Sequence, residues 1–188
     1  MLNSRWFWIL IAVLVFWVLG AYNRLVRLRA QVKQQFGPLE AVLLNYQELV
    51  QHAVSAATQA PQLWDGHAGA ELGQSHWTRL QVAAGLSTVA IARMQNHTLE
   101  EDSARALHDA AAELQDAWAA LIHPDVYYIN MPDALKQRWL ELDLLVQPEL
   151  NRFNEAITEY NQAIEQYPAA LLARLFQFNR PLRFDEFE

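Results

Sequence analysis

Histidine and glutamate are the residues of this chain whose spacing comes nearest to a metal site. Di-iron sites in helical bundles use Glu-x-x-His pairs, which place both ligands on one helical face one turn apart. No Glu-x-x-His occurs, and the only His-x-x-Glu runs from His97 to Glu100, across the predicted start of a helix. Asp65 and His67 share a predicted loop, but no third ligand accompanies them. We therefore expect no metal site and no bound cofactor.

Nucleophilic chemistry is equally unsupported. The chain contains no cysteine, which excludes a thiol nucleophile, a disulfide and a thiolate metal site. The segment Gly85-Leu86-Ser87-Thr88-Val89 lacks the second glycine of a nucleophile elbow. The acidic run Glu100-Glu101-Asp102 is typical of a first helical turn, where the macrodipole favours negative charge. We expect no catalytic residue, and the protein is predicted not to be an enzyme.

Two asparagines beside the last apolar stripe are the remaining polar residues with a regular spacing. Asn154 and Asn161 are seven residues apart and therefore share one helical face, each following an aromatic residue of an apolar stripe. They are either a solvated or capping pair, or a buried polar layer that fixes the register of packed helices.

Charge along the chain is strongly asymmetric. Five of the fourteen basic residues, from Arg5 to Lys33, precede every acidic residue. From Glu40 onward, nine basic residues face twenty-one acidic ones, a balance of −12. Such a domain repels nucleic acid and lacks the basic stripe that a phosphate backbone needs. We expect no nucleic-acid partner.

The N-terminal segment has the composition of a transmembrane helix. Trp6 to Tyr22 contains sixteen apolar residues, one glycine and no charge. Its seventeen residues span about 26 Å, slightly less than a hydrocarbon core of roughly 30 Å. A cleavable signal peptide is disfavoured, because helical periodicity continues directly beyond Val18-Leu19-Gly20. We assign residues 1–24 to a single-pass anchor whose partner is a lipid bilayer.

Orientation follows from the basic residues that flank the anchor. Arg5 and the terminal amine lie on one side, and Arg24, Arg27, Arg29 and Lys33 lie on the other. The positive-inside rule therefore predicts a cytoplasmic C-terminal domain.

Residues 25–167 carry four apolar stripes in steps of three and four, each typical of an amphipathic helix. The stripes are Leu25, Leu28, Val32, Phe36, Leu39, Leu43, Tyr46, Val50, Ala53 and Ala57; Trp77, Leu80, Ala84, Ser87, Ile91 and Met94; Ala104, Leu107, Ala111, Leu114, Trp118 and Leu121; and Leu135, Trp139, Leu142, Val146, Phe153, Ile157, Tyr160 and Ile164. They predict an all-α protein whose domain is an antiparallel four-helix bundle with coiled-coil-like packing.

Breaks and caps are expected at defined points. Gly37-Pro38 predicts a bend or a break in the first helix, and Pro148 divides or kinks the last one. Pro61 to Gln74 is predicted to be a loop, with Ser75 capping the next helix. Thr98-Leu99-Glu100-Glu101 has the pattern of a capping box.

The C-terminal tail, residues 168–188, begins at Pro168 with a predicted short amphipathic helix that carries Leu175, Phe176 and Phe178. It has three possible partners: the bundle, the bilayer surface or a neighbouring subunit. Arg174, Arg180 and Arg183 suit anionic headgroups. Phe184 and Phe187, set among acidic residues, favour protein contact.

Both ends of the chain resemble the LemA family of bacterial membrane proteins. The resemblance rests on Ala21-Tyr22-Asn23-Arg24-Leu25-Val26-Arg27-Leu28-Arg29, and on Arg152-Phe153-Asn154, Tyr160-Asn161 and Tyr167-Pro168 near the far end. It implies an N-terminal anchor, a four-helix bundle and a bacterial envelope setting. It implies no enzymatic activity.

The sequence thus predicts a membrane-anchored, non-enzymatic scaffold of the bacterial inner membrane, which assembles with itself and binds other envelope proteins. Self-assembly is expected because the apolar stem residues Leu25, Leu28 and Val32 need cover from a neighbouring stem or from the tail. The alternative is an accessory subunit that regulates a membrane enzyme or protease.

Overall fold

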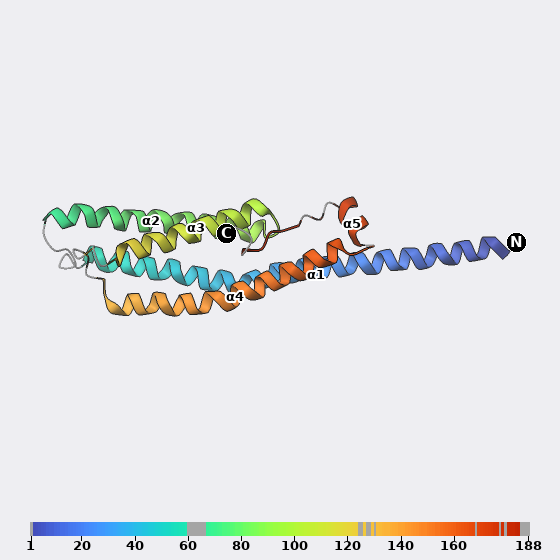
Figure 1. Cartoon of the computed structure of the whole chain (residues 1–188), viewed down its shortest axis with the longest axis horizontal. Coiled ribbons are helices and arrows are strands. Elements are labelled where there is room, and N and C mark those ends of the chain that lie inside the picture. The colour runs from blue at the N-terminus through green and yellow to red at the C-terminus, as the bar shows by residue number, and fades with distance from the viewer. Residues whose placement is uncertain are drawn as a thin grey trace.

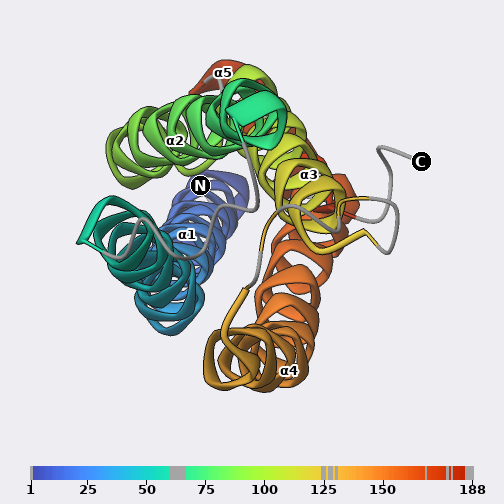
Figure 2. The same ribbon diagram turned by 90° about the vertical axis from the view of Figure 1, so that its left-hand side faces the viewer.

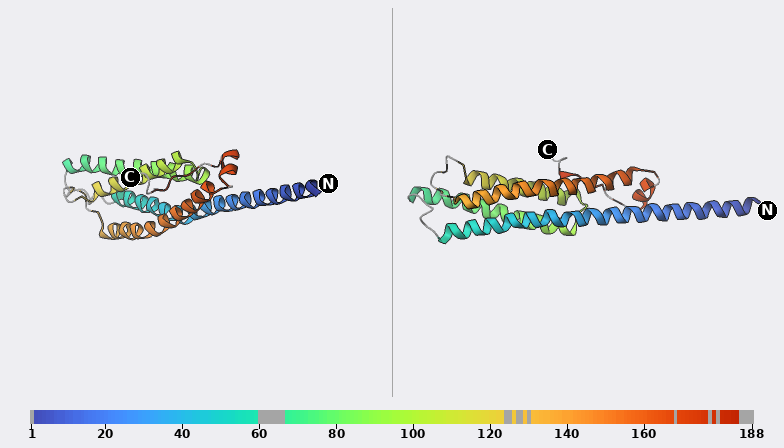
Figure 3. Two further views of the ribbon diagram at one scale, coloured as in Figure 1. Left: turned by 45° about the vertical axis from the view of Figure 1, so that its right-hand side comes forward. Right: turned by 90° about the horizontal axis from the view of Figure 1, so that it is seen from below.

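The structure, a computed structural model, describes residues 2–59, 67–123, 126, 129, 131–167, 169–176, 178 and 180–184. Within that description, the side chains of residues 2–5, 58, 59 and 67–72 are not placed. The described chain is helical, as predicted, with α1 (Leu2–Gln59), α2 (His67–Asn96), α3 (Glu101–Leu121), α4 (Asp133–Glu165) and α5 (Ala169–Leu175). The long helices run lengthwise beside one another, and the N-terminal part of α1 projects far beyond them (Figures 1 and 3).

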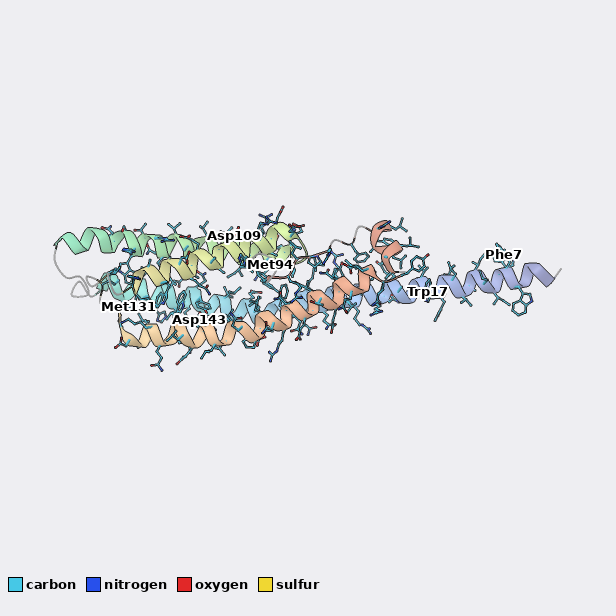
Figure 4. All side chains as sticks on the ribbon, in the orientation of Figure 1. Phe7, Trp17, Met94, Asp109, Met131 and Asp143 are labelled. Atoms are coloured by element: carbon cyan, nitrogen blue, oxygen red, sulfur yellow. The ribbon has the colours of Figure 1, made fainter. Side chains whose placement is uncertain are left out.

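The projecting part of α1 has no protein cover. Its most apolar window of 18 residues has a mean hydropathy of 2.0, and only 6% of that window is buried. Figure 4 shows Phe7 well beyond the other helices, and Trp17 closer to α5. By length and composition this helix can cross a membrane, and a signal sequence has the same pattern.

The four predicted stripes are confirmed as the core-facing sides of α1 to α4. Nearly all their residues are buried, and the exceptions, Leu43, Ala111, Leu135 and Val146, are partly buried. Phe36 and Phe153 join α1 to α4 at the centre, with ring centroids 5.8 Å apart. Periodicity therefore identified the correct faces, because each helix buries only one side.

The breaks that were predicted as one outcome at each proline do not occur, whereas the other outcome, a bend at Gly37-Pro38 or a kink at Pro148, is compatible with continuous helices. α1 continues through Pro38 and α4 continues through Pro148, although α1 curves gently along its length (Figure 1). Both prolines are exposed, so the missing hydrogen bond and the displaced carbonyl face solvent. Phe36 and Leu39 are buried on either side of Pro38, and their packing holds the helix together.

Two predicted helix starts are also wrong. α2 begins at His67, so Ser75 lies inside the helix, and residues 61–66 of the predicted loop fall outside the described residues. Burial of Gly73 and Trp77 offsets the roughly 1 kcal/mol that a glycine costs within a helix. The capping box does not form, because Thr98 Oγ1 donates to the Met94 carbonyl (2.9 Å) and Glu100 caps α3 without a side-chain bond.

The stem beyond the anchor is covered within the chain itself. Leu25, Leu28 and Val32 are buried in one cluster with residues of α4 and α5, among them Tyr160 and Leu172. The predicted need for cover from a neighbouring stem is therefore removed, because α4 extends far enough along α1 to cover these residues, together with α5 of the tail (Figure 3).

The predicted tail helix is present as α5, which packs on α4 and on α1. Its predicted first position, Pro168, lies outside the described residues, as do Phe187 and its acidic neighbours.

Candidate functional site

The helices associate as two pairs, and one side between the pairs is open. α1 packs on α4, α2 packs on α3, and α1 also contacts α2. No Cα atom of α3 lies within 8 Å of one in α4. Packed helices have axes 8–10 Å apart and bring Cα atoms closer than this. Figure 2 views the bundle along its length and shows the long helices α1, α2, α3 and α4 placed around a common centre. A groove with a volume of about 920 Å³ lies between α3 and α4.

The floor of this α3–α4 groove is apolar and comes from all four helices. It reaches down to α1 and α2, which lie behind the gap. The apolar lining residues are Leu39, Leu43, Ile91, Leu107, Ala111, Leu114, Trp139, Val146 and Leu150. An apolar cleft of this size is the expected form of a binding site in a helical bundle.

Aromatic rings close the end of the groove that is distant from the N-terminus. Trp118 of α3 stacks on Trp139 of α4, with ring centroids 4.3 Å apart and planes 5° from parallel. Tyr46 of α1 meets Trp139 edge to face at 4.8 Å. The Tyr46 hydroxyl donates to Asp143 Oδ1 at 2.5 Å. Burial, and then the hydrogen bond and charge of Asp143, raise the pKa of Tyr46 well above its ordinary value.

The C-terminal segment closes the other end of the groove. The Phe184 main-chain N–H donates to Asn154 Oδ1 (3.0 Å), and Asn161 Nδ2 donates to the Pro181 carbonyl (3.0 Å). The Phe184 ring lies 5.8 Å from that of Phe153. Both asparagines are buried, so they are not a solvated pair, and their hydrogen bonds run to the tail instead of setting the register of two helices.

The rim of the groove is polar. His108 and Gln115 of α3 face Gln147, Asn151, Glu155, Glu159 and Gln162 of α4. Deeper in the groove, Gln47 is buried and its Oε1 accepts a hydrogen bond from Thr88 Oγ1 (3.3 Å). Its Nε2 has no partner among the described residues. The groove thus combines an apolar floor with one buried donor, two glutamates on the rim and one arginine, Arg183, from the C-terminal segment.

The residues that spacing singled out do not assemble into a reactive site. His97 Nδ1 and Glu100 Oε1 lie 2.9 Å apart at the surface of the protein. Ser87 is buried, and its hydroxyl donates to the Ala110 carbonyl (3.0 Å), which ties α2 to α3. Asp65 and the side chain of His67 lie outside the described residues. Over the part of the chain that the structure describes, no group of three or more His, Asp or Glu side chains is placed to hold a metal.

Sequence reasoning missed the groove. Leu43, Ala111 and Val146 line the groove and belong to the same predicted stripes as fully buried residues, and nothing in the pattern separates a residue that meets a neighbouring helix from one that meets a gap.

Comparison with known proteins adds no identification. A scan against protein-family models, a search of curated proteins and a search of solved structures each found no match.

Proposed function

We propose that this protein is a membrane-anchored, non-enzymatic scaffold whose domain is an antiparallel four-helix bundle, open along α3 and α4 to receive a helix of a partner protein. The observation that carries this proposal is the α3–α4 groove, about 920 Å³ in volume with an apolar floor. Of the floor residues, Leu43, Ala111, Val146 and Leu150 are partly exposed. Contact of apolar surface with water is unfavourable, and a docked helix would remove these four side chains from water.

Membrane anchoring is supported by the uncovered apolar length of α1. Its apolar side chains, from Trp6 to Leu19, are mostly exposed, while the same helix enters the core at Leu25 without a break. A signal peptide cut after Gly20 would sever a helix whose Val18 and Ala21 already pack against the core. The LemA resemblance favours a bacterial inner membrane, and the basic stem favours a cytoplasmic bundle.

This anchor has a direct test. We expect the full chain to remain in the membrane pellet after washing with alkaline carbonate and, separately, with urea at neutral pH. Release into the supernatant by the urea wash would exclude an integral anchor.

The proposed occupant of the groove is an amphipathic helix with a basic polar face. Glu155 and Glu159 lie one turn apart on the α4 rim, within a domain whose balance beyond residue 39 is −12. Apolar side chains would fill the floor, and lysine or arginine would face the rim. The unpartnered Nε2 of Gln47 favours an acceptor group within the apolar face of that helix.

The test uses an 18-residue peptide of leucine and lysine with helical periodicity, labelled with fluorescein, and the full chain in phosphatidylcholine nanodiscs. Fluorescence anisotropy measures its affinity for wild type, for Ala112→Trp and for Ala92→Trp. Ala112 is an exposed residue that lines the groove, whereas Ala92 is an exposed residue of α2 outside it. Binding of the peptide to lipid is the same in all three samples, so differences report the groove.

We expect Ala112→Trp to weaken binding by about tenfold or more, equivalent to about 1.4 kcal/mol, while Ala92→Trp leaves it unchanged. Glu155→Lys with Glu159→Lys should weaken binding of the lysine peptide and strengthen binding of a matched glutamate peptide. Equal affinities for all of these proteins would exclude the groove as a helix-binding site.

Self-assembly is proposed through α2 instead of the stem. Val82, Leu86 and Val89 recur at helical spacing on one face of α2 and are more than half exposed. Because every copy is anchored by the same helix, these faces lie at one distance from the bilayer and can meet across a two-fold axis along the membrane normal. Confinement to the membrane raises the effective concentration of subunits.

A further inference from the structure

α5 lies at the point where α1 leaves the apolar span. The Tyr22 ring lies 5.3 Å from that of Phe176 and 6.5 Å from that of Phe178. Tyr22 ends the uncharged segment that begins at Trp6. Seventeen helical residues span about 26 Å, so an anchor of this length places Tyr22 at a membrane surface. α5 therefore lies at the level of the lipid headgroups.

The outward face of α5 is apolar. Leu171 is 54% exposed, Leu175 is 74% exposed and Phe176 is 54% exposed, while Tyr167 just before α5 is 75% exposed. The inward residues Ala169, Leu172 and Ala173 pack in the core. A seven-residue helix thus buries one side on the bundle and presents large apolar side chains on the other, beside the anchor.

A small hollow lies between α1 and the end of α4. It has a volume of about 470 Å³, and its lining includes the anchor residues Phe16, Trp17 and Ala21, together with Arg24, Gln166 and Tyr167. Apolar rings thus lie toward the membrane, and the guanidinium of Arg24 lies about two helical turns beyond them. Arg174, in the last turn of α5, adds a second positive charge near this level.

We propose that α5 and the adjoining end of α1 form a binding surface for an anionic phospholipid of the bilayer. An acyl chain packs against Phe16 and Trp17, and the phosphate pairs with Arg24. Leu171, Leu175 and Phe176 enter the interface between headgroups and chains, and Arg174 faces the neighbouring headgroups. This inference rests on the proposed membrane anchoring and adds a lipid class to it.

The absence of cysteine permits a test by site-directed spin labelling. Single substitutions Leu175→Cys, Leu144→Cys and Leu14→Cys are labelled in the full chain, reconstituted in nanodiscs of phosphatidylcholine with or without phosphatidylglycerol. Accessibility to oxygen and to a water-soluble nickel chelate reports the depth of each label. Leu144 is 78% exposed on α4 and serves as the matched control for Leu175, while Leu14 reports the anchor.

With phosphatidylglycerol present, we expect the label at position 175 to be shielded from the nickel chelate and the label at position 144 to remain accessible. Arg24→Gln with Arg174→Gln should restore accessibility at position 175, whereas the distant Arg138→Gln should not. Shielding that is equal in both lipids and unaffected by the arginine variants would overturn the anionic preference. A label at position 175 that is as accessible as that at 144 would overturn the inference. If the label at position 14 is also accessible to the nickel chelate, the proposed membrane anchor is rejected as well. If the label at position 14 is buried in lipid, the anchor is retained and only the lipid-binding surface is rejected.

Discussion

The main-chain N–H of Phe184 donates to the side-chain Oδ1 of Asn154, thirty residues earlier, at a distance of 3.0 Å. Two turns further along the same helix, Asn161 Nδ2 donates to the Pro181 carbonyl. The two asparagines, seven residues apart on one face of α4, thus both bond to the main chain of the C-terminal segment, which runs back along α4. These two bonds hold the C-terminal segment across one end of the α3–α4 groove.

The first prediction concerns this attachment. Asn154→Ala removes the acceptor of the buried Phe184 N–H, and an unpaired buried polar group costs about 1–3 kcal/mol. We expect faster hydrogen exchange at residues 180–184 and earlier proteolysis there, with the bundle intact. Asn151→Ala, an exposed change on the same helix, is the control. Unchanged exchange in Asn154→Ala would show that Phe153 and Phe184 hold the segment without the hydrogen bond.

The second prediction is that the stem residue Leu28 contributes to the stability of the folded bundle. Leu28 is buried within the chain, so Leu28→Asp places a carboxylate in the core and should destabilise the bundle by about 3–5 kcal/mol. Val26, two residues away, is 43% exposed, and Val26→Asp should leave the melting temperature nearly unchanged. Thermal melts followed by circular dichroism make this comparison. Equal melting temperatures would mean that the stem is not part of the core.

The third prediction concerns the exposed stripe of α2. Leu86→Asp should reduce cross-linking between copies in membranes without lowering the melting temperature, because Leu86 is 53% exposed. Leu140→Asp, at a similarly exposed leucine on α4, is the matched control and should cross-link like wild type. Should both variants assemble equally well, α2 is not the interface between copies.

The fourth prediction concerns pH. Tyr46 has a pKa raised in the folded state, so the folded protein holds this proton more tightly than the unfolded chain does. The associated stability is fully present below the ordinary tyrosine pKa of about 10 and declines as the pH rises above it. Tyr46→Phe loses a hydrogen bond to a charged group, about 1.5–3 kcal/mol, at neutral pH.

The measurement for Tyr46 is the melting temperature at about pH 7 and at about pH 10.5. Wild type should lose more stability between the two than Tyr46→Phe does. Tyr167→Phe, at a tyrosine that is 75% exposed, controls for general effects of alkali and should follow wild type. An identical alkaline loss in all three proteins would remove Tyr46 as its cause.

The fifth prediction concerns orientation. A cysteine introduced at the exposed Gln95 position should resist an impermeant maleimide in intact cells and react after the membrane is permeabilised. Ser4→Cys, on the other side of the anchor, should show the reverse pattern. Labelling of Gln95→Cys in intact cells would place the bundle outside the cytoplasm.

Local rules succeeded where a helix buries one continuous face. The stripes from Leu25 to Ile164 were predicted correctly, because period and polarity determine which side of a helix can enter a core. The predicted breaks at Pro38 and Pro148 do not occur, and the predicted helix cap at Ser75 is wrong. A proline or glycine changes helix stability by a few kcal/mol, and burial of residues such as Phe36, Leu39 and Trp77 exceeds that amount.

The sequence by itself determined that this chain is all-helical, that its N-terminal segment is apolar enough to span a bilayer, and which faces of its helices are buried. These properties depend on residues within one or two turns of one another. Only the tertiary structure decided that α4 and α5 cover Leu28, that Asn154 and Asn161 hold the C-terminal segment, and that α3 and α4 stay apart over a groove. Each of these depends on contacts between residues tens of positions apart, whose pairing no local pattern encodes.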